Sequence, residues 1–326
     1  MNFRTLLPLE KSKIDISHSS PLLCVGSCFA ENIGQRLENS KFPTFINPFG
    51  IAYNPISIAE CLSQLIENQL FTTEDIFQQG EFWHSFAHHG HFSKMSPEET
   101  LEGINSQLLT ARAFFKTTKK IIITLGSANV FIYKKTGKIV ANCHKVPNSE
   151  FEKKRLDLEG ITATMENVLT SLKIKNPELE VILSVSPIRH LREGIMENQR
   201  SKATLILASE QLCKRLDFVH YFPAYEIMMD DLRDYRFYGT DMTHPTPQAV
   251  DYIWDFFQKT YFSDNTQILT ERIERIVSAS LHRPFHTQST DYQNFVKNTL
   301  SKIDILESEF PSLNFVKERN RLIAAI

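Results

Sequence analysis

Glycine is scarce in this chain, and no apolar run is long enough to cross a membrane. Only 11 glycines and 14 prolines occur among 326 residues, which excludes a collagen-like chain and a mostly disordered one. A membrane span needs roughly 18 apolar residues in succession, and the first residues lack the apolar core and small-residue cleavage site of a secretory leader. We therefore expect a compact cytoplasmic protein without a membrane partner.

Cysteine and excess charge are also limited. The five cysteines are scattered and form no C-x-x-C pair, which argues against a disulfide framework and against a zinc finger. The 36 basic and 38 acidic residues leave a formal net charge of -2. Such a balance gives no bulk attraction to nucleic acid, so no nucleic-acid partner is expected.

Short apolar runs alternate with longer amphipathic segments, which is typical of βα units around a mostly parallel sheet. Buried strands are predicted at 21–25, 120–125, 180–185 and 217–222. Crossover helices are predicted over 31–39, 56–69, 96–115, 158–173, 197–215 and 247–261. After about residue 263 only helical patterns follow, at 267–281 and 293–310. The sequence thus predicts an α/β domain over 1–262 and a helical C-terminal extension over 263–326.

A strand followed by a glycine turn and directly by a helix is predicted at 25–31, where the sequence is VGSCFAE. Such a junction exposes one side chain above the sheet, where the N–H groups of the helix N-terminus favour negative charge. Cys28 at this junction would be a nucleophile whose thiolate the helix dipole stabilises. In the alternative interpretation, Ser27 caps the helix and Cys28 is a small buried apolar residue.

A second informative segment lies at 239–245, where the sequence GTDMTHP precedes the last helix of the α/β domain. An Asp three residues before a His in a tight turn can reach Nδ1 of that His and leave Nε2 free to accept a proton. Asp241 and His244 would then be the orienting acid and the base of a catalytic triad. The alternative is an Asp that caps a turn beside a surface His.

The two segments together resemble the linear layout of the SGNH/GDSL esterases. The stretch at 25–31 resembles the defining segment of the GSCFA family, a bacterial family placed near those hydrolases. Three further segments resemble the same family, namely SVSPIRH at 184–190, ENQRSKA at 197–203 and YEIMMDDLRDYRFYGTDMTHP at 225–245. The resemblance covers roughly residues 20–260 and implies a three-layer α/β/α sandwich with a mostly parallel, SGNH-hydrolase-like sheet.

The esterase blocks also imply roles at the strand ends. The G-D-S-L-type block places Cys28 on the nucleophile, with Ser27, one residue out of register, as the fallback. The N–H groups of Cys28 and Gly50 would donate to the oxyanion. The third block expects Asn at position 128, which is alanine here, so Asn129 is the candidate side-chain donor. Losing one such donor typically costs about 10²–10³ in rate.

Five polar residues near the same edge of the sheet are expected to bind substrate, because ligands of open α/β sheets bind at the carboxyl ends of the strands. They are Asn47, His84, Ser85, Arg189 and His190. Arg189 could hold a carboxylate or phosphate in a bidentate fork, or it could form a structural ion pair with an acid of the following DDLRD segment.

The leading hypothesis is an ester or thioester hydrolase, or an acyltransferase, that forms an acyl-enzyme on Cys28 and needs no cofactor. Its substrate would be a small-molecule or glycan acyl ester. A second hypothesis is a noncatalytic ligand-binding module on the same fold. A third is a metal-dependent protein that uses the four histidines between His84 and His91. No fixed ligand spacing such as H-E-x-x-H accompanies them, so no metal is expected.

Overall fold

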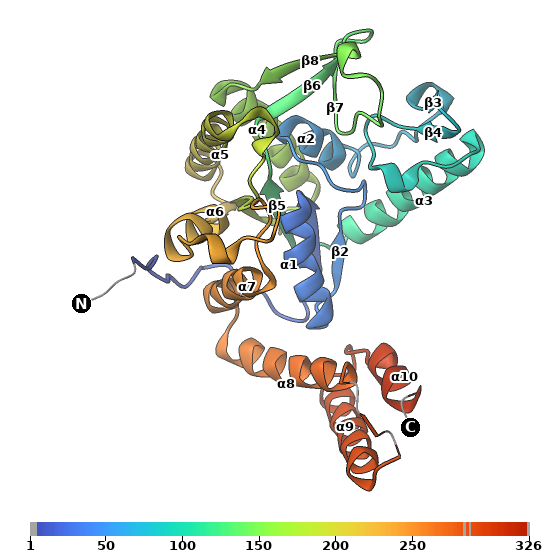
Figure 1. The fold of residues 1–326 in the computed structure, drawn as a ribbon, viewed down its shortest axis with the longest axis vertical. Helices are drawn as coiled ribbons and strands as arrows, with labels where there is room; N and C mark the ends of the chain where they lie inside the picture. The colour runs from blue at the N-terminus through green and yellow to red at the C-terminus, as the bar shows by residue number, and fades with distance from the viewer. Residues whose placement is uncertain (1–4, 283–284, 287, 325–326) are drawn as a thin grey trace.

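The computed structural model describes residues 5–282, 285–286 and 288–324, and its centre is a five-stranded parallel sheet (Figure 1). The strands lie in the order β10-β9-β5-β1-β2. Their bounds are Leu22–Gly26 for β1, Thr44–Ile46 for β2, Lys120–Leu125 for β5, Glu180–Val185 for β9 and Val219–Phe222 for β10. Every neighbouring pair in this sheet is parallel, which confirms the predicted α/β class.

Helices cover both faces of the sheet and complete a three-layer sandwich. One face carries α1 (Cys28–Asn39) and α7 (Pro247–Tyr261). The other carries α2 (Pro55–Ser63), α3 (Pro97–Phe115), α4 (Leu158–Lys175) and α5 (Ile195–Arg215). In β1 the buried side chains alternate between these two cores, with Cys24 on the α1 side and Val25 on the α4 side. Burial on both faces explains why the strands are continuous apolar runs.

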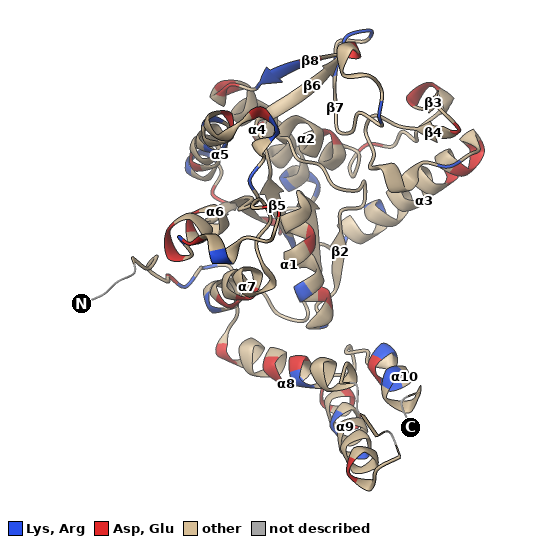
Figure 2. Cartoon of the chain, in the orientation of Figure 1, with Lys and Arg blue, Asp and Glu red and all other residues tan. Residues whose placement is uncertain are grey.

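Two small antiparallel sheets lie beside the central one and were not predicted. Strands β6 (Asn129–Tyr133), β7 (Lys138–Val140) and β8 (Phe151–Arg155) form one, in the order β7-β6-β8, and strands β3 (Phe77–Gln79) and β4 (Phe82–His84) form the other. Charges of both signs are spread over the helices, whereas β8 ends in three consecutive basic residues, at 153–155 (Figure 2). Four of the five β8 residues are exposed, so this strand has no apolar run that would identify it.

Short helical segments fill the connections. They are α6 (Ala224–Glu226), a π-helical turn at Ile227–Asp231, and 3₁₀ turns at Thr73–Asp75, Gly90–Phe92, Asn148–Glu150, Leu191–Glu193 and Tyr235–Phe237. Several of these turns lie in the loops that follow the sheet strands, so they shape the edge where the expected site residues gather.

The C-terminal part is helical, as predicted, and consists of α8 (Asp264–Ser280), α9 (Thr290–Glu309) and α10 (Val316–Ala324). These helices bury their own apolar cluster and lie beyond the ends of α1 and α7 (Figure 1). Polar contacts join them to the sandwich: Lys41 Nζ lies 2.7 Å from Glu318 Oε2, and Glu274 Oε1 accepts hydrogen bonds from Ser40 Oγ and Trp254 Nε1 at 3.0 and 3.2 Å. Both side chains of the Lys41–Glu318 pair are largely buried.

Several predicted elements agree with the structure to the residue, namely β5, β9 and α7. The helix predicted over 56–69 ends earlier, since α2 closes at Ser63, and the short helix α10 was not predicted. In the described parts of the chain, no helix combines the length and the apolar character that a membrane span requires.

Candidate active site

The turn after β1 presents Cys28 at the first position of α1. Gly26 has φ 138°, and a Cβ at this position would overlap the carbonyl oxygen of Thr124 on β5, so only glycine fits. Ser27 is fully buried, and its hydroxyl accepts a hydrogen bond from the N–H of Phe29 at 3.3 Å. Ser27 is therefore the N-cap of α1, and the partly exposed Cys28 is the side chain that the turn offers above the sheet.

Tyr53 is the hydrogen-bond partner of the Cys28 thiol, with Oη 3.6 Å from Sγ. The loop after β2 carries Tyr53 across the ends of two strands: Ala52 N–H donates to the carbonyl of Gly26, and Gly126 N–H donates to the carbonyl of Tyr53, at 3.1 and 2.8 Å. Burial, followed by the charge of Cys28, raises the pKa of the Tyr53 phenol. Tyr53 therefore stays protonated and can donate a hydrogen bond to a thiolate.

Asp241 and His244 form a pair in the loop before α7. His244 Nδ1 lies 2.6 Å from Asp241 Oδ2, and the backbone N–H of His244 donates to Asp241 Oδ1 at 3.0 Å. Backbone N–H groups of His244 and Thr243 and the His244 ring hold the pKa of the Asp241 carboxyl well below its usual range. About half of each side chain is exposed, so the free Nε2 of His244 is open to solvent.

The loop of Asp241 and His244 is fastened to the loop that follows β9. The N–H of Arg189 donates to the carbonyl of Thr243 at 3.1 Å, and the N–H of Gly239 donates to the carbonyl of His244 at 2.7 Å. The first bond brings the late Asp–His segment to the carboxyl edge of the sheet, where Cys28 also lies, and the second closes the Asp–His loop on itself.

His190 lies between the Cys28 turn and the Asp241–His244 pair. Its ring meets the ring of Tyr53 edge-on, with centroids 5.5 Å apart. Gly126 has both His190 and Ser27 as close neighbours. A Cβ on Gly126 would lie 3.3 Å from His190 Nε2 and 3.3 Å from the Cβ of Ser27, so the imidazole and the turn that carries Cys28 lie on either side of Gly126. His190 Nε2 is buried and has no hydrogen-bond partner among the described residues.

The charge state of His190 follows from its surroundings. Burial is the main cause that lowers its pKa to about 4, and the charges of Lys202 and His244 act in the same direction. His190 is therefore a neutral imidazole near pH 7. Cys28 and His244, both described residues, share no hydrogen bond in this structure, and Tyr53 and His190 are the side chains between them.

A fully buried lysine lies beneath this group and was not foreseen from the sequence. Lys202 Nζ donates to the carbonyls of Gly126 and Ser186, each at 2.7 Å, and so joins the loops after β5 and β9. Burial lowers its pKa to about 7. One turn earlier on α5, Asn198 Oδ1 accepts from the N–H of His190 at 2.8 Å. The inward face of α5 is polar near the site, at Asn198 and Lys202, and mostly apolar farther along the helix. Polar residues on an otherwise apolar helix face are the sequence feature that could have revealed these two residues.

Two expected oxyanion donors are corrected by the structure. The N–H of Gly50 donates to the carbonyl of Asn47 at 2.8 Å in a tight turn, so it is not free for a substrate. Asn129 begins β6, which pairs within the small antiparallel sheet, and with Phe131 and Glu197 it lines a groove whose lining does not include Cys28. Neither residue fills the role that the esterase blocks implied.

Asn47 supports the nucleophile turn from below. Its Oδ1 accepts a hydrogen bond from the N–H of Gly26 at 2.9 Å, and its own N–H donates to the carbonyl of Cys24 at 2.8 Å. Its Nδ2 is buried and has no partner among the residues that the structure describes. Asn47 therefore fixes the Gly26 turn, where substrate contact was expected.

The histidine-rich loop packs against the loop after β2, where the N–H of His89 donates to the carbonyl of Phe49 at 3.2 Å. His84 bonds through Nδ1 to Ser93 Oγ at 2.6 Å, and Ser85 Oγ bonds to His88 Nδ1 at 3.0 Å. Neither His84 nor Ser85 bonds to or stacks on the described residues around Cys28, and their contact with substrate stays a prediction. No three His, Cys, Asp or Glu side chains within the described ranges converge as a metal site.

Arg189 has no acidic partner among the described residues, and its Nε is buried without a hydrogen bond. The acids proposed as partners are occupied elsewhere: Asp230 pairs with Arg233, and Asp231 accepts from the N–H of Leu7 at 2.7 Å. The structural ion pair considered for Arg189 is therefore wrong.

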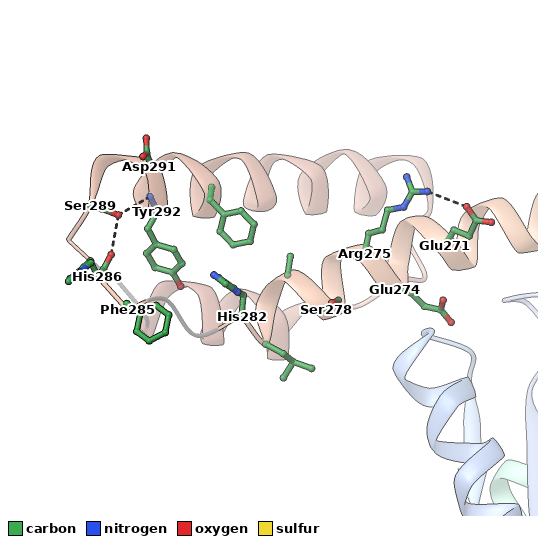
Figure 3. A pocket seen from close by; sticks show the side chains of 13 residues that line it. Glu271, Glu274, Arg275, Ser278, His282, Phe285, His286, Ser289, Asp291 and Tyr292 are labelled. Atoms are coloured by element: carbon green, nitrogen blue, oxygen red, sulfur yellow. Dashed lines mark hydrogen bonds and ion pairs between the residues drawn. The ribbon is translucent and has the colours of Figure 1, made fainter. Parts of the chain in front are cut away.

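A large hollow of about 1390 Å³ lies in the C-terminal helices, between α8 and α9 (Figure 3). The rings of His282, Tyr292 and Phe295 contact one another along its wall. None of its lining residues belongs to the carboxyl edge of the sheet, so this hollow is distinct from the Cys28 site.

Comparison with known proteins gives the family. The model of the GSCFA family matches residues 21–257, and the model described as the C-terminal domain of GSCFA domain proteins matches residues 273–325. No curated protein matches the chain. Among solved structures, an acetyl xylan esterase (Est2A) from the rumen bacterium Butyrivibrio proteoclasticus is similar at 12% identity and a TM-score of 0.38. That similarity covers 76% of this chain and only 65% of the esterase. Since the first family model includes both the Cys28 turn and the Asp241–His244 loop, the chain belongs to the GSCFA family, as the resemblance in its sequence predicts.

Proposed function

We propose that this protein is an acyl-transfer enzyme, an ester or thioester hydrolase or an acyltransferase, with Cys28 as its nucleophile. One observation carries the proposal: a partly exposed thiol at a helix N-terminus and an Asp–His pair lie at the same edge of the sheet. Cys28 begins α1, and the bond from Arg189 to Thr243 holds the His244 loop to the end of β9. A nucleophile, a base and an orienting acid are the groups that acyl transfer requires.

The reaction has two stages. His244 accepts the thiol proton of Cys28 as the sulfur attacks the carbonyl carbon of the substrate, a C–S bond forms, and the carbonyl electron pair moves to oxygen. Collapse of this intermediate breaks the bond to the leaving alcohol or thiol, which takes a proton from His244. Water or another acceptor, deprotonated by His244, then attacks the thioester and releases Cys28 as the thiolate.

Two side chains support an oxyanion site different from the one that the esterase blocks imply. The N–H of Cys28 is at the first helical position, where it has no acceptor within the helix. The protonated Tyr53 and the neutral His190, as its Nε2–H tautomer, are further donors beside the same turn. They take this role in place of Gly50, whose N–H is occupied, and of Asn129, which begins β6.

The proposed acyl-enzyme is tested by mass spectrometry of the intact protein and of its proteolytic peptides. Incubation with p-nitrophenyl acetate and with an acetyl thioester, followed by an acid quench, is expected to trap one acetyl group on the peptide that contains Cys28. Cys28→Ala removes the adduct. Cys143→Ala, which changes another partly exposed cysteine outside the site, retains it.

Two other results would change the assignment. An adduct on Ser27 that survives in Cys28→Ala would move the nucleophile by one residue. Absence of any adduct and of turnover with both ester and thioester would contradict the enzyme proposal and favour a ligand-binding module on this fold.

A further inference from the structure

Arg189 is a cation without a counterion among the described residues, in the loop that also carries His190 to the proposed active site. It follows directly after Ile188 in the loop beyond β9, and its neighbour His190 lies beside Tyr53 and the nucleophile turn. The Nε of Arg189 is buried and unpaired, and no carboxylate of the described residues is within ion-pair distance. Arg189 as a whole is only partly buried, so a ligand from solvent can reach it, while its Nε–H is buried and unpaired. A buried donor without a partner is costly, so this position indicates a ligand that completes it.

The loop that carries Arg189 is fixed in place. The N–H of Arg189 donates to Thr243, and the N–H of His190 donates to Asn198 Oδ1. Ser186, in the same loop, is held through its carbonyl by Lys202. The backbone beneath the guanidinium is therefore preorganised, which lowers the cost of binding a ligand.

The surroundings of Arg189 favour an anion. Burial raises the pKa of the Tyr225 and Tyr238 phenols, and the charge of Arg189 partly offsets this rise in both, so both rings lie close to the guanidinium. The nearby carboxylate of Glu226 accepts hydrogen bonds from Tyr221 Oη at 2.9 and 3.0 Å. Lys202 Nζ, in the same region, donates to the carbonyls of Gly126 and Ser186 and has no carboxylate partner among the described residues.

We propose that Arg189 binds an anionic group of the substrate, a carboxylate or a phosphate, so that the enzyme acts on acyl esters or thioesters that carry a negative charge. The inference rests on the proposed function for its site, and it adds the substrate class. A planar guanidinium offers two parallel N–H donors to either anion, which a neutral acyl chain cannot use.

Calorimetric titration tests the anion site without relying on turnover. Succinate and inorganic phosphate are titrated separately into the full chain, and the anion that binds more tightly identifies the carboxylate or the phosphate as the group recognised. Arg189→Met is expected to weaken that binding by about 10–100-fold, as loss of a charge-assisted hydrogen bond does. Arg189→Lys should recover only part of it, because an ammonium cannot form the bidentate pair.

Arg233→Met is the matched control, because Arg233 is an exposed arginine paired with Asp230. It should bind both anions as the unmodified protein does. Equal affinity in the unmodified protein and in Arg189→Met, or no binding of either anion at millimolar concentration, would overturn the inference.

A kinetic comparison separates this inference from the proposed function. Succinyl and butyryl thioesters have acyl chains of equal length and differ by one carboxylate. We expect a lower KM for the succinyl thioester, and loss of that preference in Arg189→Met. Turnover of both thioesters with equal KM would reject the anion site and leave the enzyme proposal standing. Anion binding that depends on Arg189, without turnover of either thioester, would reject the enzyme proposal and keep the anion site.

Discussion

The hydroxyl of Tyr53 lies 3.6 Å from the sulfur of Cys28, so the thiol is bonded to the loop after β2 and not to the late Asp–His loop. Burial keeps this phenol protonated by raising its pKa, and its proton can be donated to a thiolate. Tyr53 is therefore the contact through which the nucleophile is stabilised before substrate enters.

Tyr53→Phe tests that contact. The variant keeps the ring against His190 and removes only the donor to sulfur, and a hydrogen bond to a charged group is worth about 1.5–3 kcal/mol. We expect the rate of iodoacetamide alkylation of Cys28 at pH 7 to fall by about 10–100-fold. Tyr133→Phe, in β6, is the control and should leave that rate unchanged. An unchanged rate in Tyr53→Phe would show that the bond does not stabilise the thiolate.

The cysteines should differ in reactivity. Burial raises the pKa of Cys61 to about 12 and that of Cys213 to about 11, so both thiols stay protonated near neutral pH. Iodoacetamide should modify Cys28 before either of them, because the thiolate is the reactive form. Peptide mapping after short exposure checks this order, and faster labelling of Cys61 or Cys213 would contradict it.

Ser27 and Cys28 should be separable by their effects on stability and on turnover. Ser27→Ala removes the N-cap bond to Phe29 and is expected to cost about 1 kcal/mol in the free energy of unfolding. Cys28→Ala should abolish acyl transfer with little loss of stability, and Cys28→Ser should run slowly because a hydroxyl needs a stronger base. Urea unfolding and turnover measured on the same samples make the comparison. Full activity in Cys28→Ala would reject the nucleophile.

The central strands could be predicted from the sequence because packing against helices on both faces leaves a continuous apolar run. Lys120–Leu125 and Glu180–Val185 are such runs, and their bounds agree with the structure. Edge strand β2 is only three residues long and partly exposed, and β8 is one buried residue followed by four exposed ones. Neither strand has an alternation of apolar and polar residues that distinguishes it from a loop, so only its pairing with a neighbouring strand in the folded protein identifies it.

The site was predictable only where local spacing sets the geometry. An Asp three residues before a His can form the Asp241–His244 contact within one turn, whereas Tyr53 reaches Cys28 through backbone bonds to the ends of β1 and β5. No local pattern marks Tyr53. Gly50 and Asn129 followed from esterase blocks, and the actual turn at Gly50 and the departure of β6 could not be read from those blocks.

Acid should destabilise the protein through His88, which lies outside the proposed active site. Burial, with smaller effects of His144 and His91, lowers the pKa of His88 to about 3, against an ordinary value of 6.5. The unfolded chain therefore binds this proton from pH 6.5 downward while the folded protein does not, so stability falls as the pH drops from 6.5 toward 3. At pH 4 this one group should cost about 3 kcal/mol relative to pH 7.

His88→Phe is the matching variant, because Phe71 and Phe92 already surround the ring at 4.7 and 5.2 Å between centroids. Between pH 6.5 and 4, the slope of its unfolding free energy against pH should be smaller than in the unmodified protein, by the amount that corresponds to about one bound proton. The measurement is urea unfolding at several pH values. Identical pH dependence in the two proteins would show that His88 is not held neutral by the fold.

The last prediction concerns the contact between the sandwich and the C-terminal helices. Lys41 and Glu318 form a largely buried ion pair at 2.7 Å, and the Lys41 ammonium also lies 5.2 Å from the centre of the Phe315 ring. Removing one partner of a buried pair leaves the other charge uncompensated, which typically costs about 3–5 kcal/mol. Lys41→Met should therefore destabilise the protein strongly, whereas the double change Lys41→Met with Glu318→Met should recover most of the loss. Urea unfolding of both single variants and the double variant completes the cycle. Additive losses in the double variant would mean that the two charges do not interact and that other contacts, such as those of Glu274, hold the helices in place.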